Sequence, residues 1–349
     1  MTSDGAVTKE VTARSSKSEK VVAVYGAAGH TGRFVTAELV RRGISPLLCG
    51  RDERKLDDVA KSTPGSEVRV AKLDDPASLN RALDGALAVI NCAGPYLDTA
   101  PQVIEAAIRG RIHYLDLTAE QASAAATFEN FAGASEAVGV VVAPAMAFYG
   151  GLADLLSTVA VGDWSRVDEV RIAIALDSWH PTLGTRLTGE RNTVPRVVWS
   201  EDRMQLLEDP APTRTWNFPE PFGSQDVVEV PLSEIITISR HLQTSEIHNY
   251  LNTTPLADLN DANTPPPVAI DGAGRSSQVF VVDVKARRGS ELRRASARGR
   301  DIYAVSAPIV VEAAVRIIDG KTKRIGVAAA MNSSTLQSFC SRLNQIILS

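Results

Sequence analysis

The chain has 349 residues, of which 44% are hydrophobic and 22% are charged, as in folded globular proteins. Its 37 basic and 41 acidic side chains leave a net charge of -4, which argues against a dedicated nucleic-acid-binding protein. No run reaches the roughly 18 apolar residues of a membrane helix, and the three widely spaced cysteines fit neither a disulfide framework nor a zinc site. We therefore expect a cytoplasmic protein without a metal, a nucleic-acid partner or a membrane partner.

Residues 20–150 alternate short apolar runs with helix patterns. The polar residues 1–19 contain no apolar signal segment and are expected to form a disordered arm. Continuous apolar strands separated by helices indicate a parallel sheet that is covered on both faces. This segment is therefore predicted to be a Rossmann-type, doubly wound α/β domain, with strands at 21–26, 45–50, 67–73, 87–94, 111–117 and 139–147.

The pattern changes after residue 150. A strand pattern at 169–179, two Pro-rich stretches at 208–222 and 263–267, and a hairpin pattern around Gly289-Ser290 predict a second, α+β domain with a mixed or antiparallel sheet over 151–320. A helix is expected at 306–319, a strand at 324–331 and a further helix at 333–348. We expect the last segment, 321–349, to pack back on the first domain.

The first strand is followed by a turn with three glycines, Gly26-Ala-Ala-Gly29-His-Thr-Gly32. Between a strand and a helix, such glycines permit a sharp turn, a close approach of the backbone to a pyrophosphate, and close packing of the helix. The helix N-terminus offers free N–H groups to the phosphates. The alternative is an ordinary turn that happens to contain glycines. We predict a dinucleotide site with contacts from Gly26, Ala28, Gly29, His30, Thr31 and Gly32.

The residues after the second and third strands indicate which dinucleotide binds. Arg51 stands where NAD-binding domains usually carry an acidic residue, and its guanidinium suits the 2′-phosphate of NADP(H). Asp52 keeps the NAD alternative open, since a shift of one residue would place a carboxylate at the ribose. Asp74 either reaches the adenine or acts as a turn or cap residue beside Asp75. We predict NADP(H).

The carboxyl ends of the later strands form the predicted cleft. Cys92, Ala93 and Gly94 are small enough for a ribose and a nicotinamide to lie against their backbone. Hydride addition to a double bond also needs a proton donor. The candidates for catalytic roles are Tyr96, Tyr149 and Asp116. The alternatives are that the tyrosines only pack and that Asp116 caps the next helix.

Three further residues are candidates for substrate contacts. Phe148 follows the sixth strand, and His180 lies in a loop of the second domain. Arg186 is suited to holding a carboxylate through two hydrogen bonds. The arginine-rich segment 287–300 is interpreted as a solvated hairpin face or as a contact with a second subunit, so we expect a homodimer.

Several motifs together resemble the saccharopine dehydrogenase-like reductases, including the trans-acting enoyl reductase branch. The glycine turn alone is not specific, because extended short-chain dehydrogenases share it. The motifs are GAAGHTG at 26–32, CGRDERKL at 49–56, VINCAGPY at 89–96, HYLDLTAE at 113–120, AMAFYGGLADLLS at 145–157 and GRDIYAVSAPIVVEAAVRII at 299–318. In the last motif, Ser306 replaces the threonine that is usual in the family.

This resemblance implies a Rossmann domain, an inserted dimerisation and substrate domain, and hydride transfer with NADP(H). Family members reduce imines derived from amino acids or C=C bonds in lipid-like or polyketide chains. The expected function is therefore reduction of a C=N or an activated C=C bond in a small metabolite, with a role in secondary metabolism. The alternatives are a regulator that senses NADP(H) without catalysis and a scaffold with a vestigial glycine turn.

Overall fold

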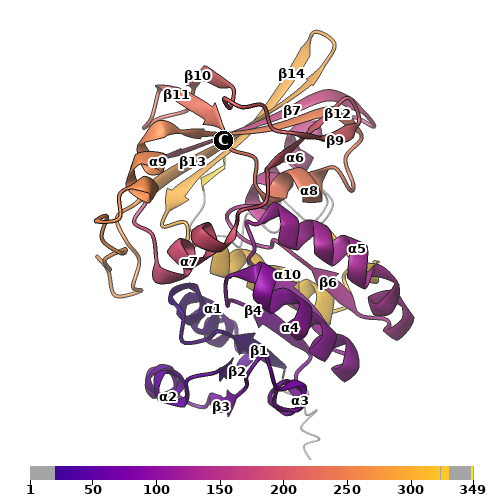
Figure 1. Cartoon of the computed structure of the whole chain (residues 1–349), viewed down its shortest axis with the longest axis vertical. Coiled ribbons are helices and arrows are strands. Elements are labelled where there is room, and N and C mark those ends of the chain that lie inside the picture. The colour runs from indigo at the N-terminus through magenta and orange to yellow at the C-terminus, as the bar shows by residue number, and fades with distance from the viewer. Residues whose placement is uncertain (1–19, 323, 330–346, 349) are drawn as a thin grey trace, which may run out of the picture.

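Two β-sheets lie one above the other along the long axis of the molecule (Figure 1). The computed structural model describes residues 20–322, 324–329 and 347–348. The first sheet has seven parallel strands in the order β15-β6-β5-β4-β1-β2-β3. Its strands are β1 (Val21–Tyr25), β2 (Ser45–Gly50), β3 (Glu67–Val70), β4 (Ala88–Asn91), β5 (His113–Asp116), β6 (Val141–Ala143) and β15 (Gly326–Val327).

Helices cover both faces of the first sheet, which confirms the predicted doubly wound fold. The helices are α1 (His30–Arg41), α2 (Glu53–Lys61), α3 (Pro76–Leu83), α4 (Tyr96–Gly110), α5 (Gln121–Val138) and α10 (Ser306–Ile318). The apolar residues of α3 and α4 share one core, and those of α1, α2 and α10 belong to the other. The strand order reverses between β1 and β4, and in such sheets ligands bind beyond the carboxyl ends of the strands at that point.

The second sheet has nine strands and is mixed, as predicted. In its centre, β7 pairs in parallel with β12 and antiparallel with β13. The predicted hairpin is confirmed, since Arg288 of β13 faces Glu291 of β14. The strands are β7 (Val167–Leu176), β8 (Val197–Ser200), β9 (Arg203–Leu206), β10 (Thr213–Asn217), β11 (Ser224–Glu229), β12 (Thr244–Asn252), β13 (Val279–Arg288), β14 (Glu291–Arg300) and β16 (Ile347–Leu348).

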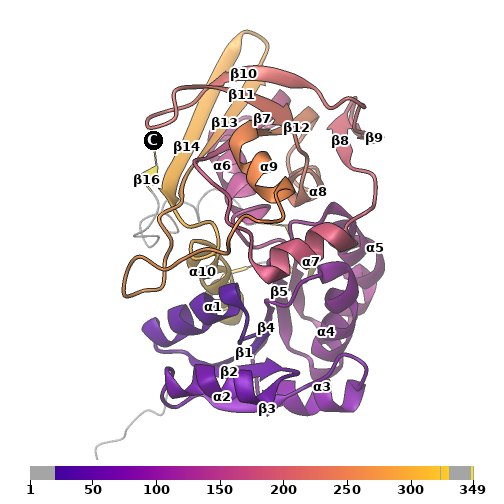
Figure 2. The ribbon, with the colours of Figure 1, turned by 60° about the vertical axis from the view of Figure 1, so that its left-hand side comes forward.

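Four helices belong to the middle of the chain: α6 (Gly151–Val161), α7 (Leu183–Arg191), α8 (Ser233–Ile238) and α9 (Thr253–Asn260). Figures 1 and 2 both place α7 between the two sheets. None of the helices within the described residues is long and apolar enough to cross a membrane.

The chain returns to the first sheet before its last segment. Helix α10 packs against α1, and β15 then extends the first sheet next to β6. The predicted arm 1–19 and most of the predicted helix 333–348 lie outside the described residues. Ile347 and Leu348 form strand β16, which pairs with β14 in the second sheet, so the helix prediction is wrong at these two residues. The boundaries near 150 and 320 stay predictions.

Candidate functional site

The three glycines of the first turn have different roles: two avoid steric clashes and one caps α1. Gly26 has φ +83°, and a Cβ there would lie 3.0 Å from the backbone of Ala93. A Cβ at Gly32 would come closer than 3.0 Å to the carbonyl oxygen of Gly26. Gly29 is the N-cap of α1, and no side chain accepts a hydrogen bond from the first turn of this helix. The helix therefore presents its first N–H groups to a ligand, as a pyrophosphate site requires.

The other residues of this turn lie where a dinucleotide would pass. Ala28 and Thr31 are half-buried. The ring of His30 makes edge-to-face contacts with Phe34 and with Tyr303, at centroid distances of 5.3 and 5.2 Å. Burial lowers the pKa of His30, and its Nε2 atom is buried without a hydrogen-bond partner. The neutral His30 ring thus links the glycine turn to the segment before α10.

The end of β2 favours Arg51 over Asp52 as the ribose-side residue. The Asp52 carboxylate caps α2 by accepting a hydrogen bond from the Lys55 N–H, at 3.2 Å. Arg51 is exposed, and its guanidinium pairs with no residue in the described part of the chain. Burial raises the pKa of Tyr25 to about 12, while the nearby positive charge of Arg51 opposes this rise. A free arginine beside the end of β1 suits a 2′-phosphate.

At the end of β3, as at the end of β2, one residue caps the next helix and its neighbour has no hydrogen-bond or ion-pair partner in the described part of the chain. Asp75 caps α3 by accepting a hydrogen bond from the Ser78 N–H, at 3.0 Å. Asp74 is exposed and makes no hydrogen bond or ion pair with a described residue. Asp74 therefore does not act as the cap, which leaves its carboxylate available at the cofactor edge of the sheet.

The turn after β4 is shaped by the buried Asn91. Its amide donates to Thr99 Oγ1 at 3.1 Å and to the Tyr114 hydroxyl at 3.3 Å, and its oxygen accepts from the Ala93 N–H. Residues 92–94 are half-buried and follow the carboxyl end of β4. Burial raises the pKa of the Cys92 thiol, which makes this thiol a poor nucleophile.

Tyr96 lies just beyond this turn with a protonated hydroxyl. Burial raises its pKa well above the usual 10, and the nearby Cys92, Asp116 and Glu120 add to this effect. The hydroxyl has no hydrogen-bond partner among the described residues, and the side chain is only partly buried. The Tyr96 hydroxyl is therefore protonated at neutral pH and unpartnered within the part of the chain that the structure describes.

Asp116 is fully engaged within the protein. One of its carboxylate oxygens accepts from the N–H groups of Thr118 and Ala145, at 3.0 and 2.8 Å, and the other accepts from the Tyr114 hydroxyl at 2.9 Å. Burial raises its pKa to about 6, against these stabilising hydrogen bonds. Asp116 does not cap α5, which begins at Gln121 after Glu120. Its position fits a residue that organises the ends of β5 and β6.

Glu120 is a residue of this site that sequence reasoning assigned no role. Its carboxylate accepts hydrogen bonds from the N–H groups of Tyr96 and Leu97, at 2.7 and 3.2 Å. It therefore caps α4 from a neighbouring strand end and fixes the main chain that carries Tyr96. No local pattern announces this contact, because 24 residues separate the partners.

The two residues predicted after β6 occupy different surroundings. Phe148 is 1% exposed and packs edge-to-face on Phe280 and Tyr149, so its side chain does not face the cleft. Tyr149 is buried and stacks on Trp179 at a centroid distance of 5.4 Å. Its hydroxyl is buried and unpartnered. Burial raises the Tyr149 pKa well above 10, with Tyr303 and Glu234 adding to the rise.

Helix α7 and the loop before it close over the turn after β4. A Cβ at Gly94 would lie 2.8 Å from Thr188 Oγ1, and Arg191 forms an ion pair with Asp98 of α4 at 3.0 Å. Tyr303 holds the other end, because its hydroxyl lies 2.9 Å from Thr185 Oγ1 and 3.1 Å from the Trp179 indole nitrogen. Tyr303 belongs to the motif at 299–318, but its role as an anchor needs the tertiary structure.

The predicted substrate residues of the second domain are held by this arrangement. His180 lies with its Nδ1 atom 3.2 Å from the carbonyl oxygen of Pro265. The guanidinium of Arg186 donates to the carbonyl oxygens of Asp261 and Thr264, at 3.2 and 2.8 Å. One guanidinium nitrogen of Arg186 therefore ties α7 to the loop that follows α9, and the role of Arg186 toward a carboxylate stays a prediction.

Comparisons with known proteins agree with this geometry. Residues 22–139, which contain the glycine turn and the ends of β1 to β5, match the family model of the saccharopine dehydrogenase NADP binding domain. A saccharopine dehydrogenase-like oxidoreductase of Homo sapiens is 34% identical over 115 residues, which cover 28% of this chain and 27% of that protein. A lipid droplet localized protein of Caenorhabditis elegans is 35% identical over 113 residues, covering 29% of this chain and 26% of that protein. The match thus spans about a quarter of the length of these relatives.

The likeness of the fold extends over both domains. Saccharopine dehydrogenase (L-Glu forming) from Saccharomyces cerevisiae superposes with a TM-score of 0.67 over 95% of this chain and 99% of that chain. The two sequences are 12% identical, so this similarity concerns the fold.

Proposed function

Because residues 22–139 match the saccharopine dehydrogenase NADP binding domain, we propose that this chain belongs to the saccharopine dehydrogenase-like family and is an NADPH-dependent reductase. The proposed reaction reduces a C=N bond or an activated C=C bond of a small metabolite, within secondary metabolism. The observation that carries the proposal is the open end of α1 beside an unpaired Arg51. A helix terminus without a side-chain cap and a free guanidinium supply the two recognition elements that NADP(H) requires.

The residues of the first domain fit the cofactor along its whole length. The lack of a Cβ at Gly26 and Gly32 lets the first turn lie close to the backbone of Ala93 and lets α1 pack close on that turn, which sets the N-terminus of α1 where a pyrophosphate would bind. Arg51 and Asp74 lie at the adenosine end, and residues 92–94 form the backbone edge at the nicotinamide end. When bound there, NADPH supplies a hydride.

The proposed proton donor is Tyr96. A substrate that accepts a hydride develops negative charge, and a protonated hydroxyl within reach stabilises it by donating its proton. The raised pKa keeps the Tyr96 hydroxyl protonated at neutral pH, and Glu120 fixes its main chain. Asp116 orients the ends of β5 and β6 around this donor through its three hydrogen bonds.

A fluorescence titration with NADPH and with NADH tests the cofactor assignment. We expect tight NADPH binding, weak NADH binding, and a loss of the preference in Arg51→Ala. The matched control is Arg54→Ala, which removes an exposed arginine from the first turn of α2. Equal binding of both cofactors by the unaltered protein would contradict the role of Arg51. No binding of either would refute the reductase.

Imines and enones can then be screened by the loss of NADPH absorbance. Turnover that depends on the Tyr96 hydroxyl favours the reductase over a regulator that only senses NADP(H), since a sensor needs no proton donor. We also propose that the protein is a cytoplasmic homodimer joined through its second sheet. Light scattering of the purified protein tests the dimer, and a monomeric mass would refute it.

A further inference from the structure

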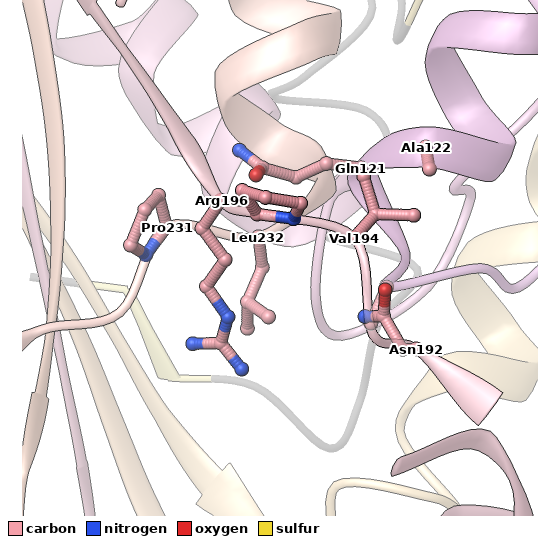
Figure 3. Close-up of a pocket in the computed structure, with 9 residues that line it drawn as sticks. Gln121, Ala122, Asn192, Val194, Arg196, Pro231 and Leu232 are labelled. Carbon is pink, nitrogen blue, oxygen red and sulfur yellow. The ribbon is translucent and has the colours of Figure 1, made fainter. Parts of the chain in front are cut away.

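The second domain carries an exposed arginine that forms no ion pair with a described residue. Arg196 precedes β8 and lines a small pocket together with Gln121, Pro231 and Leu232. In Figure 3 its side chain runs alongside Leu232 and away from Gln121. The guanidinium makes no hydrogen bond or ion pair within the described residues. One guanidinium nitrogen of Arg186, in contrast, donates to two carbonyl oxygens.

The position of Arg196 is fixed by the site itself. The side-chain amide of Gln121, the first residue of α5, donates to the carbonyl oxygen of Val197 at 2.8 Å and accepts from its N–H at 2.9 Å. These two hydrogen bonds hold the start of β8 against the start of α5. Arg196 thus stands at a set place at the junction of the two domains, and an arginine held in this way suits an anionic group.

A buried carboxyl group lies close to this arginine. Glu234 of α8 is 0% exposed, its Oε2 atom accepts from the Gly150 N–H at 3.1 Å, and its Oε1 atom is buried without a partner. The Gly150 N–H belongs to the residue that follows Tyr149, whose hydroxyl is also buried and unpartnered. Buried polar atoms are normally hydrogen-bonded, and both of these unpartnered oxygens belong to side chains on which the charge of Arg196 acts, which points to a ligand between the three groups.

We propose that Arg196, Glu234 and Tyr149 form a subsite for the carboxylate of the substrate, and that Glu234 binds this carboxylate in its protonated form. Arg196 supplies the charge, while the Glu234 carboxyl group and the Tyr149 hydroxyl donate hydrogen bonds. The proposal deepens the proposed reductase function, on which it rests, by assigning the substrate an acidic group.

The charges around Glu234 explain why its proton matters. Burial raises the pKa of Glu234 to about 7, the charge of Arg196 opposes this rise, and the nearby Asp154 adds to it. Asp154 lies behind Glu234 and contacts His241 Nε2 at 2.6 Å. Below pH 7 the neutral Glu234 leaves the Arg196 charge for a ligand. Above pH 7 the ionised Glu234 neutralises Arg196 and repels a carboxylate, so anion affinity falls as pH rises.

The test compares crotonate with its uncharged amide, crotonamide, on the NADP⁺-loaded protein by ligand-observed NMR. At pH 6 we expect crotonate to bind about tenfold more tightly than crotonamide. Between pH 6 and pH 8 the crotonate affinity should fall by up to about tenfold, since each pH unit above the Glu234 pKa removes most of the protonated form. Glu234→Gln, which cannot ionise, should keep its crotonate affinity at pH 8.

Variants of Arg196 test whether this residue supplies the positive charge of the subsite. Arg196→Met should abolish the preference for crotonate, and Arg196→Lys should keep part of it. The control is Arg203→Met, which removes an exposed arginine of β9 that pairs with Glu201. Thermal melting and NADPH titration of every variant show that fold and cofactor site are intact. Failure of the unaltered protein to bind NADPH would refute the proposed function. Crotonate and crotonamide would then be compared on the cofactor-free protein, where the loss of preference in Arg196→Met still tests the subsite.

Three outcomes would overturn the subsite. They are equal binding of crotonate and crotonamide by the unaltered protein, no binding of crotonate up to about 50 mM, at which contacts of this kind would be saturated, and an undiminished preference in Arg196→Met. A crotonate affinity that does not change between pH 6 and pH 8 would overturn the role of the Glu234 proton.

Discussion

Substitution of Gly32 by alanine tests whether the close approach of α1 to the first turn builds the cofactor site. The added Cβ would lie closer than 3.0 Å to the Gly26 carbonyl oxygen and 3.0 Å from Ala27 Cα, whereas ordinary contacts begin at 3.4 Å. Both neighbours are backbone atoms, so no side chain can turn aside. Helix α1 must therefore shift by about 0.5 Å or more, at a cost of about 1–3 kcal/mol in the free energy of unfolding.

The same shift moves the N-terminal N–H groups of α1 away from the pyrophosphate. We expect the dissociation constant for NADPH to rise at least about tenfold, which corresponds to about 1.4 kcal/mol. Fluorescence titration measures this constant, and urea unfolding measures the stability. The matched control is Gly133→Ala in α5, where a Cβ meets nothing within 4 Å and alanine favours the helix. A Gly32→Ala protein with unchanged NADPH affinity and stability would refute this steric account.

Three further changes test other parts of the site. Tyr96→Phe should lower kcat for any acceptor found in the screen by about 10²-fold or more with unchanged NADPH affinity, and full turnover would exclude Tyr96 as the donor. Glu234→Gln should leave the free energy of unfolding unchanged at pH 4 and raise it by about 1–3 kcal/mol at pH 8. The reason is that the Glu234 pKa of about 7 in the folded protein exceeds the usual 4.5, so the wild-type protein loses stability as the pH rises through that range. Equal urea midpoints of the two proteins at pH 8 would contradict this. Tyr303→Phe removes the hydroxyl that bonds Thr185 of α7 and the Trp179 indole, so it should speed tryptic cleavage after Arg186 and Arg191 in α7. An unchanged cleavage rate would show that other contacts hold α7.

The position of α7 has a consequence for how ligands enter the site. This helix has no buried residue, yet it lies against Gly94 and is tied at both ends by Tyr303 and by the ion pair between Arg191 and Asp98. An exposed ion pair contributes little to stability, commonly 1 kcal/mol or less. The helix is therefore held mainly by polar contacts, which water can replace when a ligand passes.

The sequence by itself determined the first domain and the nature of its cofactor. Glycines at 26, 29 and 32 act through backbone geometry within one turn, and Arg51 acts at the end of one strand. Such signals are local, so they can be read along the chain. The caps also follow local rules, and the structure shows which residues cap: Asp52 and Asp75 accept from the first turns of α2 and α3, whereas Arg51 and Asp74 have no described partner. Their contacts with the cofactor stay predictions.

The tertiary structure decided which polar groups meet across the cleft. Glu120 reaches the N–H of Tyr96 from 24 residues away, and Tyr303 reaches Thr185 from 118 residues away. The sequence named Arg186 as the arginine for a carboxylate, and this role stays a prediction. In the structure one guanidinium nitrogen of Arg186 donates to backbone carbonyls of a distant loop, whereas Arg196 has no hydrogen bond or ion pair with a described residue. Whether a charge is free depends on every group that packs around it, and those groups come from segments whose meeting no local pattern encodes.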